Sequence, residues 1–291
     1  MKLFIFGLGY SALYFLAHHA QGFSEVAGTV RTKDKAERLK AAGVQAFIFG
    51  PEYEDPAIQG KLGAAEALLV SIPPGTSADP ALARFGRKIA AAPHLRKIIY
   101  LSTIGVYGDR QGEWVEETRL PAPKSDRSVA RLHAEKSWIA MAKGTQIDVQ
   151  ILRLAGIYGP GRNALSGLKA GTARRIVKPG QVFNRIHVED VGRAIAAAFK
   201  REGTSDYFNI CDDEPAPPQD VITYAASLMQ IEPPPELDFE TADLTPMARS
   251  FYSENKRVLN TKLKQDLGVT LAYPTYREGL QALFEQGEGR N

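Results

Sequence analysis

Three small residues at fixed spacing, Gly7, Gly9 and Ala12, form the part of this sequence best suited to hold a phosphate group. They make the pattern G-x-G-x-x-A, which follows an apolar run at residues 3–6 and precedes apolar residues at helical spacing from residue 13. The two glycines permit a tight turn and let the backbone approach a pyrophosphate, and the small third residue keeps the helix close to the strand. Because a helix N-terminus also favours negative charge, the pattern predicts a dinucleotide-binding turn.

A second strand, expected at residues 25–30, ends in Arg31, Thr32 and Lys33 rather than in an acidic residue. An Asp or Glu here would bind the ribose 2′-hydroxyl of NAD, whereas an Arg accommodates the 2′-phosphate of NADP. We therefore expect NADP as the cofactor, with NAD as the second possibility. The alternative is that Arg31 and Lys33 are ordinary surface cations at the start of a helix over residues 35–42.

Strands and helices alternate through the first half of the chain, which positions these loops. Further strands are expected at residues 44–49, 67–72, 97–102 and 148–154, with helices at 13–20, 81–91 and 128–142. Such alternation predicts an α/β fold with a Rossmann-type, doubly wound parallel sheet, whose ligand lies at the carboxyl ends of the strands. The loop after the strand at 67–72 should join the cofactor site there. The expected cofactor contacts are Gly7, Leu8, Gly9, Tyr10, Ser11, Arg31, Thr32, Ser71, Ile72 and Pro73.

The pattern changes in the second half of the chain. Residues 155–180 are rich in glycine and basic residues, and prolines cluster after residue 212. Helices are expected at 191–199 and 220–229, and Thr275 and Glu278 form a capping box for a last helix. We expect an NAD(P)-binding Rossmann domain over residues 1–155, to which residues 181–200 return, and a smaller C-terminal substrate-binding lobe over 156–180 and 201–291.

Composition and charge argue against several classes of protein. The 291 residues include 36 Lys and Arg against 33 Asp and Glu, scattered without a basic strip, so we expect no nucleic-acid partner. No apolar segment reaches membrane-spanning length, and the five histidines lack ligand spacing, so we expect neither a membrane partner nor a metal. The single cysteine, Cys211, is expected to be a buried small hydrophobe. We expect a cytoplasmic protein, because glycines interrupt the apolar core of the only stretch that could be read as a secretory signal.

Several short segments, taken with the N-terminal turn, carry a family signature. They are Ser102-Thr103 with Val106-Tyr107-Gly108, Glu116-Glu117-Thr118, Ala134-Glu135, residues 153–161, residues 185–191 and residues 207–210. In their order and spacing, the chain resembles the extended short-chain dehydrogenase/reductases, the NAD(P)-dependent epimerase/dehydratase family, over nearly its whole length. The resemblance places Thr103 at the catalytic Ser/Thr position of that family.

The resemblance also shows a departure at the family's Tyr-x-x-x-Lys motif. In such enzymes the Tyr exchanges a proton with the substrate oxygen while hydride moves to or from the nicotinamide, and the Lys lowers the Tyr pKa and holds the nicotinamide ribose. Here Arg127 stands at the Tyr position and Arg131 at the Lys position. A guanidinium has a pKa above about 12, so Arg127 cannot exchange a proton near neutral pH. Arg131 could still bind the ribose, and the chain looks like an atypical branch of the family.

The same helix also permits a purely structural interpretation. Arg127, Arg131 and Glu135 lie at i, i+4 and i+8, where an Arg131–Glu135 ion pair would be a surface contact worth a few tenths of a kcal/mol. The neighbouring stripe of Ala130, Ala134, Trp138 and Met141 is expected to be core.

Tyr107 is the first candidate for a replacement acid, because it follows the strand at 97–102 and lies close to Thr103 in the sequence. The alternative is a packed ring that supports the loop. Thr103 would hydrogen-bond the reacting oxygen, and Arg127 and Arg185 are the candidates for binding an anionic part of the substrate. His187 is another titratable candidate of suitable pKa, although the resemblance favours a structural or hinge role for it.

Two functions from different classes follow. The first is an NADP-dependent reductase or epimerase-like oxidoreductase that acts on a small anionic carbonyl or hydroxyl substrate. The second is a non-catalytic NADP-binding sensor or regulatory protein, which the loss of the Tyr-x-x-x-Lys motif favours. Because paired chains are common in the family, the resemblance also makes a homodimer possible.

Overall fold

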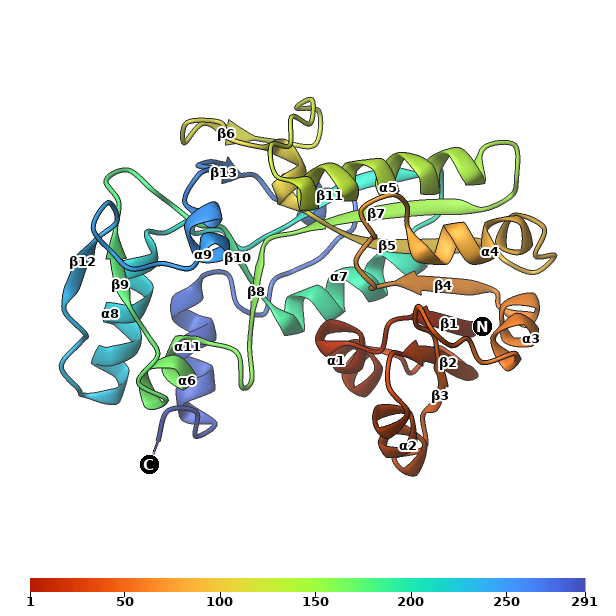
Figure 1. The fold of residues 1–291 in the computed structure, drawn as a ribbon, viewed down its shortest axis with the longest axis horizontal. Coiled ribbons are helices and arrows are strands. Elements are labelled where there is room, and N and C mark those ends of the chain that lie inside the picture. Colours follow the sequence, from red (N-terminus) through yellow and green to blue (C-terminus); the bar gives the residue numbers. More distant parts are fainter. Residues whose placement is uncertain (291) are drawn as a thin grey trace. The chain divides into compact units, whose positions relative to one another are not determined.

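The computed structural model describes residues 1–290 and contains a central seven-stranded sheet (Figure 1). The strand order is β11-β7-β5-β4-β1-β2-β3. The strands are β1 (Lys2–Phe6), β2 (Glu25–Val30), β3 (Gln45–Ile48), β4 (Ala67–Val70), β5 (Lys97–Thr103), β7 (Asp148–Leu154) and β11 (Asp206–Ile210). β1 pairs in parallel with β2 and with β4, so that Leu3 lies opposite both Val26 and Ala67. This is the Rossmann-type parallel sheet that the alternation predicts, and the fold class is confirmed.

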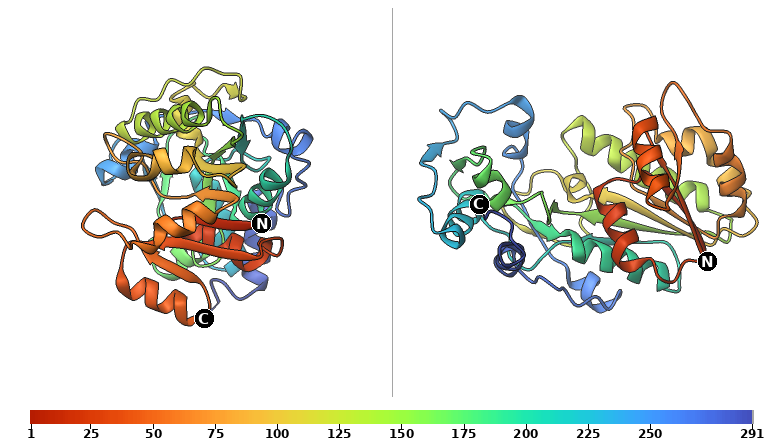
Figure 2. Two further views of the ribbon diagram at one scale, coloured as in Figure 1. Left: turned by 90° about the vertical axis from the view of Figure 1, so that its right-hand side faces the viewer. Right: turned by 90° about the horizontal axis from the view of Figure 1, so that it is seen from below.

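Helices cover both faces of this sheet, as Figure 2 shows. They are α1 (Tyr10–His19), α2 (Lys33–Ala41), α3 (Ala57–Ala64), α4 (Pro80–Ala90), α5 (Asp126–Ala142) and α7 (Val188–Lys200). One large apolar cluster joins α3, α4 and α5 to the sheet and includes Phe6, Phe85 and Trp138. α1 packs on α7, where the Phe15 and Phe199 rings lie 6.0 Å apart. The expected core positions Ala134 and Trp138 are buried, whereas Ala130 and Met141 are half-buried.

The chain divides into two units by its internal contacts. Unit 1 consists of Met1–Thr103, Asp126–Arg153 and Gly192–Phe208, and unit 2 of Ile104–Ser125, Leu154–Val191 and the residues from Asn209 onward. The sequence places residues 104–125, 154–155 and 181–191 with the Rossmann domain, whereas they fall in unit 2. Residues 201–208, which the sequence places in the C-terminal lobe, fall in unit 1. Unit 2 is nearly as large as unit 1 and exceeds the small lobe that the sequence predicts.

Unit 2 is built from short strand pairs and helices. Its parallel pairs are β8 (Gly156–Tyr158) with β10 (Arg185–His187), β9 (Arg175–Val177) with β12 (Glu236–Asp238), and β6 (Trp114–Val115) with β13 (Arg257–Val258). Its helices are the 3-10 turn η1 (Ile104–Tyr107), α6 (Ala164–Lys169), α8 (Pro218–Met229), α9 (Pro246–Phe251), α10 (Thr261–Gln265) and α11 (Tyr276–Glu285). Tyr158, Leu165, Tyr276 and Leu280 form the centre of its apolar core. The capping box of Thr275 and Glu278 opens α11, as predicted.

Local features confirm some sequence expectations and add elements that were not foreseen. The strands at 25–30 and 148–154 have the predicted bounds, whereas helix α3 and edge strand β11 were not expected. Cys211 is buried, and burial raises the pKa of its thiol, as suits a small hydrophobe.

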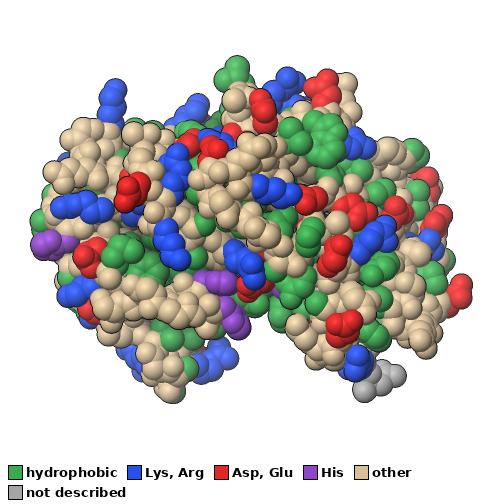
Figure 3. Space-filling view, turned by 180° about the vertical axis from the view of Figure 1, so that it is seen from behind, with side chains coloured by type: hydrophobic (Ala, Val, Ile, Leu, Met, Phe, Trp, Pro, Cys, Tyr) green, Lys and Arg blue, Asp and Glu red, His purple; other side chains and the backbone are tan. Residues whose placement is uncertain are grey.

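None of the helices within residues 1–290 has the length and apolar character needed to cross a bilayer. On the face drawn in Figure 3, acidic and basic side chains are interspersed, in keeping with a formal net charge of +3.

Candidate functional site

The tight turn expected after β1 is present at Gly7. Its φ is +96°, and a Cβ atom at this position would lie 2.6 Å from Cγ2 of Ile72. The Gly7 N–H donates to Oγ1 of Thr29 on β2 at 2.9 Å. Both the dihedral angle and the close approach of Ile72 therefore require glycine.

Helix α1 begins directly after this turn without a side-chain cap. Its N-cap is Gly9, whose backbone is extended, and its first turn contains no acidic residue. A Cβ atom on Gly9 would meet nothing within 4 Å, whereas Ser11 and Ala12 are buried against the protein. The open side of Gly9 thus gives a ligand access to the start of the helix, where backbone N–H groups favour a phosphate.

Arg31 follows the carboxyl end of β2 and is exposed. Its neighbours make local contacts: Oγ1 of Thr32 accepts from the Lys35 N–H as the N-cap of α2, and Lys33 lies 3.8 Å from Glu37. Across residues 1–290, Arg31 makes no side-chain hydrogen bond or ion pair. Lys33 therefore fits the alternative of an ordinary surface cation. The Arg31 guanidinium, in contrast, has no carboxylate partner within residues 1–290 that would compete with a bound phosphate.

The loop after β4 lies beside the end of β1. The N–H groups of Ser71 and Ile72 both donate to the carbonyl oxygen of Phe6, at 2.8 and 3.2 Å. The structure thus brings together Gly7 and the Ser71–Pro73 loop, two of the segments expected to contact the cofactor.

Arg131 of α5 reaches the same edge of the sheet. Its Nη1 donates to the Leu101 carbonyl oxygen at 2.8 Å, to Oη of Tyr100 at 3.1 Å and to the Ile72 carbonyl oxygen at 3.4 Å. Arg127, one turn earlier, is exposed and has no side-chain partner in the described part of the chain. The two arginines of the Arg-x-x-x-Arg segment therefore have different surroundings.

The expected surface pair between Arg131 and Glu135 is wrong. Glu135 is 0% exposed and accepts hydrogen bonds from Oγ of Ser102 and from Nη2 and Nε of Arg153, the latter at 2.8 and 3.2 Å. The Arg153 guanidinium also lies 4.6 Å from the centre of the Tyr207 ring. A buried carboxylate needs charged donors, and the neighbouring strand β7 supplies them in bidentate form.

Residues 102 and 103 end β5. Ser102 is buried and bound to Glu135, whereas Thr103 is half-buried as the last residue of the strand. Anchoring of Ser102 by α5 fixes the backbone that carries Thr103.

Tyr107 lies in the core of unit 2. Its side chain is 0% exposed, and its hydroxyl donates to Oδ1 of Asn209 at 2.7 Å. The Asn209 N–H in turn donates to Oε1 of Glu117 at 2.7 Å. These contacts fit the alternative of a packed ring that supports the loop, and we do not propose Tyr107 as a proton donor to substrate.

Arg185 in unit 2 is held by backbone oxygens. Its Nη1 donates to the carbonyl oxygens of Phe183 and Ala216, at 2.9 and 3.1 Å, and its guanidinium lies 5.9 Å from the centre of the Tyr276 ring. Burial lowers the pKa of Arg185. Asp212, which donates its N–H to the Arg185 carbonyl oxygen, is 1% exposed, and burial raises its pKa to about 8. In its protonated form Asp212 carries no charge that would neutralise the Arg185 guanidinium.

His187 lies between aromatic rings. The rings of Tyr158 and Tyr273 lie 5.1 and 4.2 Å from its own, and its Nδ1 accepts from the Glu189 N–H at 3.1 Å. Burial lowers the pKa of His187 to about 4, so the imidazole is neutral near pH 7. These contacts fit the structural role that the resemblance favours for His187.

The sequence interpretation missed Tyr100 and Asp79 in unit 1. Tyr100 accepts from Arg131, and Asp79 caps α4 by accepting from the Ala81 and Leu82 N–H groups at 3.0 and 3.1 Å. The Asp-Pro pair at the start of α4 is a signal that could have identified this cap.

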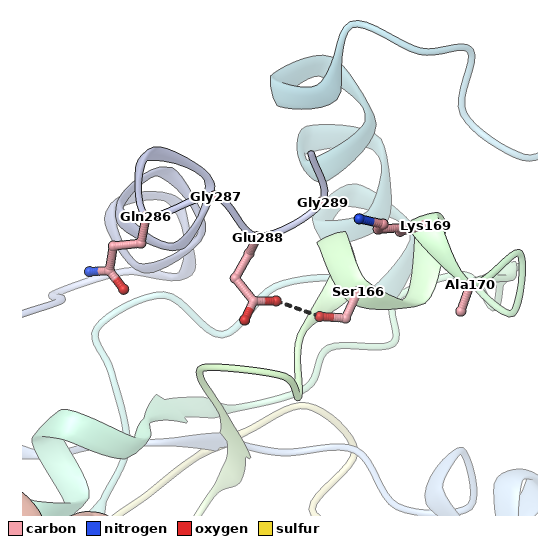
Figure 4. Close-up of a pocket in the computed structure, with 7 residues that line it drawn as sticks. All are labelled: Ser166, Lys169, Ala170, Gln286, Gly287, Glu288 and Gly289. Carbon is pink, nitrogen blue, oxygen red and sulfur yellow. Dashed lines mark hydrogen bonds between the residues drawn. The ribbon is translucent and has the colours of Figure 1, made fainter. Parts of the chain in front are cut away.

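A cavity of about 480 Å³ in unit 2 is lined by none of the expected site residues (Figure 4). It is lined by Ser166, Lys169, Ala170, Gln286, Gly287, Glu288 and Gly289. Glu288 accepts from Oγ of Ser166 and from the Gly161 N–H, at 2.7 and 2.8 Å. The carboxylate thus ties the segment after α11 to α6 and the loop before it.

Comparison with known proteins identifies the family of the chain. The model of the NAD dependent epimerase/dehydratase family matches residues 87–211. Protein YeeZ of Escherichia coli K12 is 31% identical over 245 residues, which cover 80% of this chain and 85% of YeeZ.

Solved structures share the fold. A functionally unknown conserved protein from Silicibacter pomeroyi DSS is 47% identical, with a TM-score of 0.89 and 99% of each chain covered. UDP-glucuronic acid 4-epimerase from Bacillus cereus, solved in complex with NAD, is 18% identical, with a TM-score of 0.75 and coverage of 98% of this chain and 99% of that one. The last similarity is one of fold alone.

Proposed function

Since this chain belongs to the NAD dependent epimerase/dehydratase family, we propose that it binds a nicotinamide dinucleotide at the turn between β1 and α1. The observation that carries the proposal is the pair of glycines there: Gly7 has a φ of +96°, and the outer side of Gly9 is open at an uncapped helix N-terminus. A pyrophosphate would satisfy the N–H groups at the start of α1. When bound, the nicotinamide would supply a hydride acceptor or donor.

The residues around the turn fit the remaining parts of such a cofactor. Leu8, Tyr10 and Ser11 belong to the turn and the first turn of α1, and the Ser71–Pro73 loop is tied to β1 through the Phe6 carbonyl oxygen. Arg131 has N–H groups beyond Nη1 for the nicotinamide ribose.

We propose NADP rather than NAD as the cofactor. The support is the exposed Arg31 at the end of β2, which has no carboxylate partner within residues 1–290 and can pair with a 2′-phosphate. Thr32 adds a hydroxyl next to it, already shared with the Lys35 N–H.

The favoured reaction class is hydride transfer to or from a small anionic carbonyl or hydroxyl substrate. Arg185 supports the anionic substrate, because the two hydrogen-bond acceptors of its guanidinium, the Phe183 and Ala216 carbonyl oxygens, are neutral. Arg127 is an exposed guanidinium of unit 1 with the charge to attract an anion. Thr103 would hydrogen-bond the reacting oxygen. Because Tyr107 is engaged by Asn209, the proton would come from a water molecule.

A non-catalytic NADP-binding sensor is the second candidate. It is favoured by Arg127 and Arg131 at the positions where the family has its Tyr and Lys, since neither guanidinium can transfer a proton. In this case the cofactor would bind tightly without turnover.

One experiment tests both candidates. The purified protein is titrated with NADPH and NADH by fluorescence, and cofactor oxidation is then measured against aldehydes, ketones and sugar acids. Tighter binding of NADPH than of NADH with turnover supports the oxidoreductase, and the same binding without turnover supports the sensor. If neither nucleotide binds, the cofactor proposal is wrong.

A further inference from the structure

Tyr100 is a fully buried phenol in the middle of β5 that the proposed function does not use. Its side chain is 0% exposed and its ring lies 6.2 Å from that of Trp138. Its hydroxyl oxygen accepts a hydrogen bond from Nη1 of Arg131 at 3.1 Å, and the Arg131 guanidinium carbon lies 5.7 Å from the centre of its ring. Tyr100 therefore contacts Arg131 through both its hydroxyl and its ring, a hydrogen bond and a cation–π contact.

The bonds of Arg131 are concentrated on one nitrogen. Nη1 carries two hydrogens and serves three acceptors, of which the Leu101 carbonyl oxygen and the Tyr100 hydroxyl are the two closer, at 2.8 and 3.1 Å. The Ile72 carbonyl oxygen, at 3.4 Å, is the third. Nε and Nη2 have no protein acceptor within residues 1–290. Nη1 of Arg131 therefore anchors the side chain at the ends of β4 and β5, and the N–H groups of Nε and Nη2 remain for a ligand.

We propose that Tyr100 is a positioning residue, which holds the Arg131 guanidinium at the carboxyl ends of β4 and β5 so that its remaining N–H donors bind the dinucleotide. This inference rests on the proposed cofactor site. Arginine has a long side chain with many rotamers. A rigid neighbour that fixes one rotamer also fixes the positions of the guanidinium N–H donors. Tyr100 can do so because its own ring is locked between α5 and the sheet.

The chemistry of Tyr100 suits an anchor and not a proton donor. Burial raises the pKa of its hydroxyl, so Tyr100 remains a neutral phenol whose oxygen can accept from a guanidinium. Asp79, which is 3% exposed, adds to this effect through its charge.

A double-mutant cycle on NADPH affinity tests the proposal. Tyr100→Phe keeps the ring and removes the acceptor, Arg131→Gln removes the guanidinium, and the third variant carries both changes. We expect Tyr100→Phe to weaken NADPH binding roughly five- to ten-fold in the wild-type background and to have no further effect in the Arg131→Gln background. Tyr224→Phe is the control, because Tyr224 lies on α8 in unit 2 and is none of the residues proposed to bind the cofactor.

The outcomes separate a positioning role from a structural one. If Tyr100→Phe weakens NADPH binding equally with and without Arg131, its effect is structural and the inference is wrong. The inference alone is also overturned if Tyr100→Phe binds NADPH as the wild type does. Failure of the wild type to bind NADPH overturns the proposed function itself, and the inference with it.

A measurement on the wild-type protein covers the case in which Tyr100→Phe does not fold. In ¹⁵N NMR spectra of the ligand-free protein, rotation of the Arg131 guanidinium about its Cζ–Nε bond should be slow, because Nη1 is anchored. The exposed Arg127 gives the comparison on the same helix. Rotation of Arg131 as fast as that of Arg127 would contradict the anchoring.

Discussion

The carboxylate of Glu135 and the guanidinium of Arg153 form a buried ion pair, with 2.8 Å between Oε2 and Nη2. The pair connects α5 to β7, and the hydrogen bond from Ser102 extends it to β5. A single carboxylate thus fixes α5 and β5, two elements that carry proposed site residues, to each other and to β7.

Neutralising this carboxylate should destabilise the protein strongly. Glu135→Gln leaves the Arg153 charge buried without compensation, and we expect the free energy of unfolding to fall by about 3–5 kcal/mol. Urea unfolding gives this value. Replacing both residues, as Glu135→Leu with Arg153→Met, should recover much of the loss, because no buried charge then remains.

The exposed pair of Lys33 and Glu37 is the control for this prediction. Glu37→Gln should change the free energy of unfolding by no more than about 0.5 kcal/mol. Equal effects of Glu37→Gln and Glu135→Gln would show that burial does not determine the strength of the Glu135 pair.

Substitutions of the two glycines in the N-terminal turn should have different effects, one on stability and the other on cofactor binding. Gly7→Ala places a Cβ atom 2.6 Å from Ile72 at a φ of +96°, so we expect a loss of at least about 2 kcal/mol in stability. Gly9→Ala meets no neighbour and should fold with a stability within about 0.5 kcal/mol of the wild type. Its methyl group would occupy the space proposed for the pyrophosphate, and NADPH binding should weaken at least about ten-fold.

Thermal unfolding and NADPH titration of both variants check these expectations. A Gly9→Ala protein that binds NADPH as the wild type does would place the phosphates elsewhere.

The parallel sheet could be predicted because its strands carry their own signal. β1 and β5 are runs of mostly apolar residues, so the local sequence alone predicts a buried strand at each. α3 and β11 were missed for physical reasons: α3 contains two glycines, which lower helix propensity, and β11 becomes a strand by pairing with β7, more than fifty residues away.

The sequence predicted the backbone turn of the site better than the burial and the partners of its side chains. The turn at Gly7 follows from local spacing, so it could be placed from sequence. The burial of Tyr107 depends on Asn209, 102 residues later, and that of Glu135 on Arg153. Partners so distant in sequence leave no periodic pattern by which a single chain reveals them.

Arg31 should determine the choice between the two nicotinamide nucleotides. Arg31→Asp removes the cation proposed for the 2′-phosphate and introduces a carboxylate that can bind a ribose 2′-hydroxyl. We expect the ratio of NADPH to NADH affinity to fall at least about ten-fold, as measured by fluorescence titration. Lys33→Gln is the matched control and should leave the ratio unchanged, because Lys33 already pairs with Glu37. An unaltered ratio in Arg31→Asp would assign the 2′-phosphate to another residue.

The stability of the protein should depend on pH through Asp212 and His187, which act in opposite directions. Burial raises the pKa of Asp212 to about 8, from an ordinary value of 3.8, so between about pH 4 and 8 the folded state holds a proton that the unfolded state has lost. Stability from this group therefore decreases as pH rises, by at most about 1.4 kcal/mol per pH unit. Burial lowers the pKa of His187 to about 4, from 6.5, so this group adds stability as pH rises from about 4 to 6.5 and compensates Asp212 there.

Only Asp212 of the two contributes between pH 6.5 and 8, which makes this interval the decisive one. We expect the free energy of unfolding, measured in urea at half-unit steps, to decrease across the interval in the wild type. Asp212→Asn has no proton to lose. The slope of its free energy of unfolding against pH should therefore be smaller than that of the wild type by an amount close to one bound proton. A profile of the same slope in the wild type and in Asp212→Asn would mean that Asp212 is ionised beside Arg185 at neutral pH, and the Arg185 charge would then be partly neutralised before any anionic substrate arrives.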